Sequence, residues 1–278
     1  MTIPSNVHTH STFCDGKNTP EEMVQAALAL GFTGLGFSSH APAPYDPTCP
    51  GVADEAAYTA HIRTLAARYE GQIDIACGIE QDAMAPVDAG AYDYVIGSAH
   101  YLRPPGSEGP LSIDMDPQHL ARLVQNWYGG DALAMVRDYY AVLAASVAQT
   151  RPTIVGHFDL VTKFNRHTPL FDEESAAYQS IALEALDAVL DAIGSYGGML
   201  EVNTGAMARG WRDAPYPAPF LLRHAAQRGA RVILSSDSHS AQTLDFAFPA
   251  ALRAICGAGF TRLAVYGNKA FTDRSIED

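Results

Sequence analysis

The feature that most constrains the fold is an alternation of short apolar segments with longer helical patterns along the whole chain. Strands that alternate with helices in this way imply a parallel sheet. At 278 residues, a closed barrel is favoured over an open sheet. We therefore predict an α/β fold in a single barrel domain over residues 1–278. The predicted strands are 3–8, 34–38, 73–79, 92–98, 153–156, 199–203, 231–235 and 262–266.

The helical segments carry recognisable start and stop signals. Thr19 is the expected N-cap of the first helix, Pro20 its first residue and Glu22 its capping-box partner. The segments between the elements include a Pro-rich loop at 41–50 and a long insertion at 102–126. The predicted helices are 20–30, 55–69, 132–149, 173–196, 219–228 and 244–257.

Composition and charge exclude several classes of protein. The net charge of −13 argues against a nucleic-acid groove, which needs a basic surface. No apolar run is long enough to span a membrane, and the N-terminus lacks the pattern of a secretory signal. The four scattered cysteines form no CxxC pair and are expected to be reduced. These features predict a cytoplasmic protein without a nucleic-acid or membrane partner, and they do not indicate an oligomeric state.

Metal-ligating residue types follow the predicted strands. His8 and His10 are two positions apart and can share one face of a strand, and Asp237 and His239 repeat that spacing. The C-terminal ends of barrel strands are where such enzymes place their chemistry. The candidate metal ligands are His8, His10, Asp15, His40, Glu80, His100, His157, Asp237 and His239.

This set is too large for one ion, which needs three or four protein ligands. A buried carboxylate at Glu80 would be costly unless it were paired or metal-bound, and it can bridge two ions. Nine ligands with Glu80 shared fit three divalent ions. Mixed nitrogen and oxygen ligation suits zinc, iron or manganese, and also cobalt. Three divalent ions facing three carboxylates leave a positive site that suits a phosphate ester.

Some chemically interesting residues have ordinary explanations. Cys14 can bind a soft metal or simply fill space beside the turn at Asp15, and both interpretations stay open. Glu201 and Asn203 are candidates to support the ligands from behind. The remaining histidines lie in helical or polar surface patterns and are expected to hold no metal; they are His61, His119, His167 and His224.

The ordered motifs resemble the PHP (polymerase and histidinol phosphatase) family, and most closely its histidinol-phosphatase branch. They span nearly the whole chain and are specific together, although none is specific alone. The motifs are His8-Thr9-His10 with Cys14-Asp15-Gly16, Ser38-Ser39-His40, Gly78-Ile79-Glu80, Gly97-Ser98-Ala99-His100, Gly156-His157-Phe158-Asp159, Glu201-Val202-Asn203-Thr204 and Ser236-Asp237-Ser238-His239.

The resemblance implies a distorted (β/α)7 barrel of parallel strands with a trinuclear site. It also implies hydrolysis of L-histidinol phosphate, in histidine biosynthesis, through attack of a metal-bridging hydroxide. The expected catalytic residues are Glu80, Asp15 and His239. By analogy, the ligand sets are His8, His10, Glu80 and Asp237 for the first ion, Glu80, His100 and His157 for the second, and Asp15, His40 and His239 for the third.

Substrate contacts are less well indicated. Arg209, Arg212 and Lys163 are the candidates for binding phosphate, although the family places an arginine sooner after Thr204. Three residues of the insertion are candidates for the cationic end of the substrate, with no choice among them: Tyr101, Glu108 and Asp114.

Three alternatives remain at this point. The first is a PHP phosphoesterase that acts on another small phosphate ester or on a nucleotide. The second is an amidohydrolase-type barrel, which shares the first histidine pair and a late Asp but does not predict the set Asp15, His40 and His239. The third is a non-catalytic protein with a decayed site, which is disfavoured because none of the nine ligands is missing.

Overall fold

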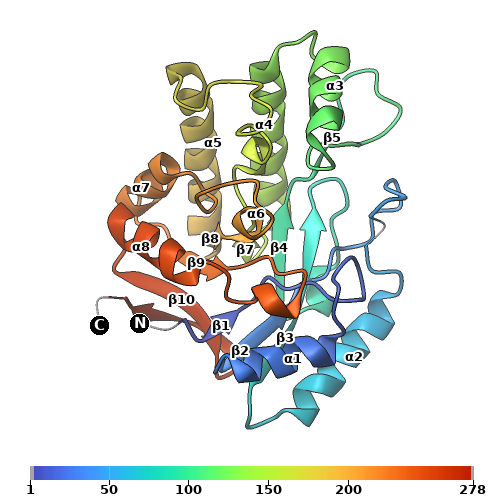
Figure 1. The fold of residues 1–278 in the computed structure, drawn as a ribbon, viewed down its shortest axis with the longest axis vertical. Helices are drawn as coiled ribbons and strands as arrows, with labels where there is room; N and C mark the ends of the chain where they lie inside the picture. The colour runs from blue at the N-terminus through green and yellow to red at the C-terminus, as the bar shows by residue number, and fades with distance from the viewer. Residues whose placement is uncertain (1–2, 50, 277–278) are drawn as a thin grey trace.

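The computed structural model describes residues 3–49 and 51–276, and a curled nine-stranded sheet lies at its centre (Figure 1). The strand order is β1-β2-β3-β4-β7-β8-β9-β10-β11. Every neighbouring pair is parallel except β10 and β11. The strands are β1 (Ser5–Asn6), β2 (Gly34–Phe37), β3 (Asp74–Asp82), β4 (Tyr94–Ser98), β7 (Ile154–Val155), β8 (Met199–Asn203), β9 (Val232–Ser235), β10 (Arg262–Gly267) and β11 (Ala270–Ser275). The predicted α/β class and distorted parallel barrel are confirmed.

The first and last parts of the sheet meet at both ends of the barrel. At the lower end, the Tyr266 amide donates to Ser5 Oγ at 3.1 Å. At the upper rim, Thr9 and Ser238 form a parallel bridge. There the His10 amide donates to the Ser238 carbonyl at 2.8 Å, and the Ser238 amide donates to the His8 carbonyl at 3.1 Å. The rim is therefore closed by the two segments that carry the predicted ligand pairs.

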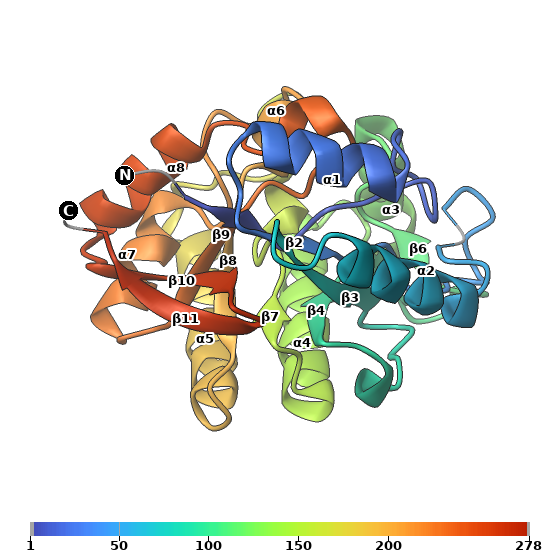
Figure 2. The same ribbon diagram turned by 90° about the horizontal axis from the view of Figure 1, so that it is seen from below.

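Helices cover the outer face of the sheet (Figures 1 and 2). The capping box of the first helix is present: the Glu22 amide donates to Thr19 Oγ1, and the Thr19 amide donates to Glu22 Oε2 at 2.8 Å. Among the described residues, no helix is both long and apolar enough to cross a membrane. The outer helices are α1 (Pro20–Ala29), α2 (Glu55–Arg68), α4 (Ala132–Thr150), α5 (Ala176–Gly194), α7 (Pro219–Gln227) and α8 (Phe248–Ala258).

Several predicted boundaries were wrong. The insertion contains a hairpin of β5 (Tyr101–Leu102) and β6 (Leu111–Ser112) and a helix α3 (Pro117–Trp127), which begins after its N-cap Asp116. Strand β11 was not predicted. Helix α8 begins four residues later than expected, because Pro249 fits only the first turn of a helix. Helix α5 begins after Ser175, whose side chain caps it, and not at residue 173.

Tyr94 fills the interior of the barrel beneath the rim. Its hydroxyl donates to the Val7 carbonyl at 2.5 Å and also lies 3.1 Å from the Phe37 carbonyl, so it connects β4 with β2 and with the residue just after β1. The ring lies against Gly36 and Gly78, where a Cβ atom would collide with it. Small residues at these two positions therefore make room for one large side chain, which closes the floor under the polar rim.

We predict that Gly78→Ala destabilises the protein by about 1–3 kcal/mol, because the added methyl group overpacks the Tyr94 ring. Urea unfolding measures the change. Gly257→Ala is the matched control, since Gly257 lies in α8 with open space around it and alanine is the better helix former. Equal unfolding midpoints for the two variants would contradict this packing.

Candidate metal centre

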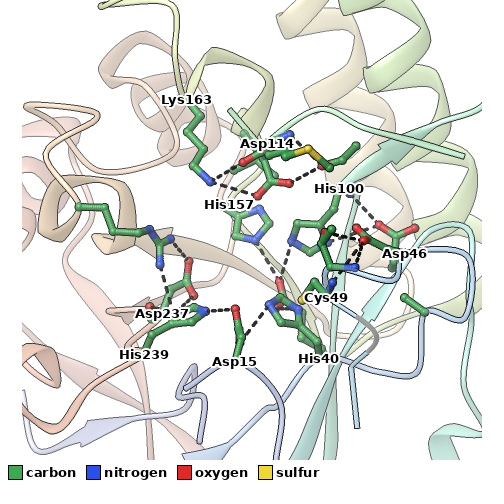
Figure 3. A pocket seen from close by; sticks show the side chains of 18 of the residues that line it. Asp15, His40, Asp46, Cys49, His100, Asp114, His157, Lys163, Asp237 and His239 are labelled. Atoms are coloured by element: carbon green, nitrogen blue, oxygen red, sulfur yellow. Dashed lines mark hydrogen bonds and ion pairs between the residues drawn. The ribbon is translucent and has the colours of Figure 1, made fainter. Parts of the chain in front are cut away.

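The upper rim of the barrel brings the nine predicted ligands together. Figure 3 labels six of them: Asp15, His40, His100, His157, Asp237 and His239. Each comes from a strand end or from the turn after it, where parallel strands place their side chains on a common edge. Glu80 lies in β3, and a parallel bridge joins it to His40 just after β2. His100 follows β4, and His157 follows β7. The side chains line a cavity of about 540 Å³ or lie directly beneath it.

Glu80 is the centre of the cluster, and its two carboxylate oxygens face different histidines. Oε2 lies 3.0 Å from His40 Nδ1, and it also faces the ring nitrogens of the first histidine pair. Oε1 lies 3.0 Å from His157 Nε2 and 3.4 Å from His100 Nε2, and it accepts from the Ser98 hydroxyl at 2.7 Å. One buried carboxylate therefore stands between two sets of imidazoles, which is the arrangement expected of a bridging ligand.

Asp15 organises a second group nearer the solvent. Its Oδ2 lies 3.2 Å from His239 Nε2, and its Oδ1 faces His10 and His40 at 3.6 and 3.8 Å. The rings of His10 and His239 stack with centroids 4.0 Å apart. The turn that carries Asp15 is tight, since a Cβ at Gly16 would collide with the backbone at the end of the first histidine pair.

Asp237 links this group to the central one. Its backbone adopts φ +48°, a left-handed conformation that is uncommon outside glycine. Its Oδ1 lies 3.3 Å from His10 Nε2 and 3.5 Å from His239 Nδ1. Its Oδ2 accepts from Arg209 Nη2 at 2.8 Å. Gly205 must be small here, because a Cβ would meet both Asp237 and the Arg209 guanidinium.

The crowding of acids and imidazoles shifts their ionisation. Burial raises the pKa of Glu80, but the positive charges of His8, His100 and His40 outweigh it and hold the pKa well below its usual range. Burial together with the neighbouring His239 and His40 lowers the pKa of His10 to about 3. Glu80 and His10 are thus in the protonation states that metal binding requires. Burial lowers the pKa values of His8, His40 and His100, but the facing carboxylates outweigh it and raise them, so an ion that binds these rings must displace protons.

Buried nitrogen atoms without partners fit a metal site. Glu201 Oε1 lies 2.6 Å from His8 Nδ1, so in the neutral ring a proton held on Nδ1 leaves Nε2 as a buried acceptor. Neither His8 Nε2 nor His10 Nε2 finds a hydrogen-bond partner among the described residues, although both side chains are fully buried. Such nitrogens are rare in folded proteins, and a cation among them would satisfy both. The donor set of imidazoles and carboxylates suits a first-row divalent ion.

Two carboxylates behind the cluster fix the histidines. The Glu201 carboxylate is hydrogen bonded to the His8 ring. It also accepts hydrogen bonds from the His157 amide at 2.8 Å and from the Asn203 side chain. Asp82 plays the same part for His100: it accepts from the His100 amide at 2.7 Å and lies 3.4 Å from the ring Nδ1. Glu201 was a predicted supporting residue. Asp82 was missed, although it lies two positions after Glu80 on the same strand.

Among the residues that the structure describes, three groups are close enough to hold ions, with their potential ligand atoms within 4.8 Å of one another. His10, His40 and Glu80 each appear in two groups, so the groups overlap more than the expected ligand sets. His157 and Asp237 belong to none of them, although His157 Nε2 contacts Glu80 and Asp237 Oδ1 lies 3.3 Å from His10 Nε2. The groups are His10, Asp15, His40 and His239; His8, His10 and Glu80; and His40, Glu80 and His100.

The predicted phosphate-binding residues lie in different places. Arg209 and Lys163 line the cavity. Lys163 Nζ is already paired with Asp114 at 3.1 Å. Arg212 does not line the cavity: it packs over the Tyr216 ring and hydrogen bonds to Thr162. Sequence spacing could not separate the two arginines, because they occupy the same loop and differ only in the direction they point.

The structure also shows which of the other candidate residues lie at the cavity and which do not. Tyr101 and Asp114 line the cavity, whereas Glu108 is exposed and is not part of its wall. The Cys14 sulfur lies 3.5 Å from His10 Nδ1 and outside the cavity lining. The four histidines that were expected to hold no metal are absent from the three groups, and His224, for example, pairs with Asp187 on the surface.

Comparisons with known proteins agree with this geometry. The PHP domain family profile matches residues 6–205. The chain is 33% identical over 274 residues to a Deinococcus radiodurans protein described as "Probable histidinol-phosphatase", covering 93% of this chain and 95% of that one. It is 28% identical to the histidinol-phosphatase of Bacillus subtilis, covering 88% and 97%.

A solved structure shows the same fold. It is the histidinol phosphate phosphatase of Lactococcus lactis, complexed with zinc, L-histidinol and phosphate. The TM-score is 0.66 at 22% identity, and the match covers 97% of this chain and 99% of that one. The similarity thus extends over the whole barrel.

We predict that Glu201→Gln weakens metal binding by about 10–100-fold, because an amide cannot hold the His8 ring in the same protonation state as a carboxylate. Competition with a chromophoric chelator measures the affinity without any turnover. Glu184→Gln is the control, since Glu184 is exposed on α5. Unchanged affinity in Glu201→Gln would exclude this supporting role.

Proposed function

Because the chain belongs to the PHP domain family, we propose that it hydrolyses L-histidinol phosphate to L-histidinol and phosphate. The curated relatives named histidinol-phosphatase support this substrate, and so does the Lactococcus lactis structure with zinc, L-histidinol and phosphate. The observation that carries the proposal is the position of Glu80 between two sets of imidazoles, which suits a multinuclear metal site.

We propose that the nine residues hold three divalent ions, with Glu80 shared. Zinc, iron and manganese all suit this mixture of nitrogen and oxygen donors. When bound, such ions supply Lewis acidity and activate water at neutral pH. The proposed sets are His8, His10, Glu80 and Asp237 for the first ion, Glu80, His100 and His157 for the second, and Asp15, His40 and His239 for the third.

The protein's own residues have distinct tasks in this proposal. Glu80, Asp15 and His239 act at the reacting phosphate in this proposal. All three line the cavity, as do His40, His100, His157 and Asp237. Arg209 binds phosphate oxygens from the cavity wall, and its bonds to Asp237 and His239 fix the guanidinium at the cluster. The wall also excludes bulk water from the buried side of the cluster, where electrostatic interactions are strongest.

The first test is phosphate release by the metal-reconstituted protein. We expect kcat/KM for L-histidinol phosphate to exceed that for sugar phosphates, nucleotides and an aryl phosphate by about 100-fold or more, because a site that binds the amino alcohol discriminates against esters that lack it. Equal or better turnover of another ester would show that L-histidinol phosphate is not the preferred substrate and would favour a PHP phosphoesterase that acts on a different ester.

We predict that Glu80→Gln abolishes turnover and lowers the bound metal content, because an uncharged amide cannot join the two sets of histidines. Activity assays and elemental analysis of the purified protein measure the two effects. The same exposed control, Glu184→Gln, is expected to retain both properties. Full activity in Glu80→Gln would contradict the proposal that Glu80 is shared between two ions.

We also predict that chelation lowers both activity and thermal stability, because ions that bind only the folded state stabilise it by mass action. Re-addition of zinc or manganese is expected to restore the melting temperature and the turnover. Scanning calorimetry of the chelated and the reloaded protein measures the stability change, and identical melting temperatures would contradict a metal site in the native protein.

A further inference from the structure

The cavity has a second wall, formed by residues 43–49 and by residues 101–114, which include the hairpin β5–β6. Neither of these two segments carries a predicted metal ligand. Asp46, Cys49, Tyr101 and Asp114 line this wall. In Figure 3, Asp46 and Cys49 lie on the opposite side of the pocket from Asp237. The cavity therefore offers acidic side chains beyond those of the metal cluster.

Asp46 is a buried carboxylate held entirely by neutral donors. Its exposed fraction is 7%. Oδ1 accepts from the Thr48 amide at 2.7 Å, from the Thr48 hydroxyl at 2.6 Å and from the Cys49 amide at 3.2 Å. Oδ2 accepts from the Tyr101 hydroxyl at 2.6 Å. Within residues 3–49 and 51–276, no lysine, arginine or histidine nitrogen lies within 4.0 Å of this carboxylate.

These donors keep Asp46 charged. Burial raises its pKa, but the hydrogen bonds from Thr48 and Tyr101 outweigh the burial and hold the pKa below its usual range. A buried ionised carboxylate without a cation is costly, so such groups are usually paired with a cation. Asp46 lines the cavity above the metal cluster, so a cationic ligand in that cavity can reach it.

Asp114, the other acid of this wall, is in a different situation. Lys163 Nζ lies 3.1 Å from both its Oδ2 and its carbonyl oxygen. The Ser112 hydroxyl donates to its Oδ1 at 3.1 Å. Its charge is thus already compensated by Lys163, and the pair as a whole is neutral. Asp46 is left as the unpaired negative charge of the second wall.

We propose that Asp46 binds the protonated amino group of an amino-alcohol phosphate and so selects a cationic ester over an uncharged one. This inference rests on the proposed function for the phosphate end of the substrate. Such a substrate is a dianion at one end and a cation at the other. The cavity matches that polarity, with Arg209 and the proposed ions at one side and Asp46 at the other.

The test is Asp46→Asn in the metal-reconstituted protein. Asparagine keeps an oxygen for the Thr48 and Cys49 donors and removes the charge. Its NH2 group takes the place of Oδ2, so the Tyr101 hydroxyl must turn and accept a hydrogen bond there instead of donating one. We expect the ratio of kcat/KM for L-histidinol phosphate to that for an uncharged aryl phosphate to fall on the order of 30-fold. The Kd of L-histidinol, measured by calorimetry, is expected to rise by a similar factor. A ratio and a Kd within about threefold of the wild-type values would overturn the proposal.

Two further variants separate charge from shape. Tyr101→Phe removes one of the donors that hold Asp46, and it is expected to lower the substrate ratio less than Asp46→Asn does, because the carboxylate keeps its Thr48 and Cys49 donors. Glu108→Gln removes an exposed acid of the same insertion and is expected to change neither the ratio nor the Kd. Loss of selectivity in Glu108→Gln to the same degree as in Asp46→Asn would indicate a general charge effect and not recognition by Asp46.

The Kd measurement with L-histidinol distinguishes a failure of this inference from a failure of the proposed function. If the wild-type protein does not prefer L-histidinol phosphate, the proposed substrate is wrong. The inference about Asp46 is then tested by the affinity of L-histidinol relative to that of its analogue without the amino group. Tighter binding of the amine by the wild type, lost in Asp46→Asn, supports it, and equal binding of the two alcohols overturns it.

Discussion

The buried carboxylate of Glu80 is the group on which the rest of the rim depends. It is 2% exposed, and an isolated ionised carboxylate in such a position costs several kcal/mol. Histidines that follow four different strands compensate the Glu80 charge. Each has a ring nitrogen within 3.5 Å of a Glu80 carboxylate oxygen. A flat sheet would hold these strand ends too far apart, so the curl of the sheet and the position of this one side chain require each other.

The rim is built in two layers of carboxylates. The inner acids face ring nitrogens across the cluster, whereas Glu201 and Asp82 stand behind it and hold both a ring and a backbone amide. An imidazole that is bonded on one nitrogen has one orientation and one free lone pair. The outer layer therefore determines where each ring points before any ion arrives, and it limits how far the cluster can relax when the ions are absent.

The sequence was sufficient for the parts of this structure that depend on position along a strand. Residues just after parallel strands must meet at one rim, so it could be predicted without coordinates that the nine candidate ligands lie together. Asp46 could not be found, because its loop has no periodicity and its role depends on the shape of the cavity. Arg209 and Arg212 could not be ranked either, since only contacts with Asp237 and Thr162 decide their directions. The antiparallel β11 was missed because its exposed residues lack an apolar alternation.

The closure of the rim between Thr9 and Ser238 has a consequence for how the protein reaches its native state. The two halves of this bridge are 229 positions apart in the chain, so the contact belongs to the most non-local class and carries a large loop-closure entropy. The first histidine pair is synthesised long before Asp237 and His239 exist. A complete cluster can thus form only after almost the whole barrel has folded. Ion binding therefore stabilises the product of the last folding step and not an early intermediate.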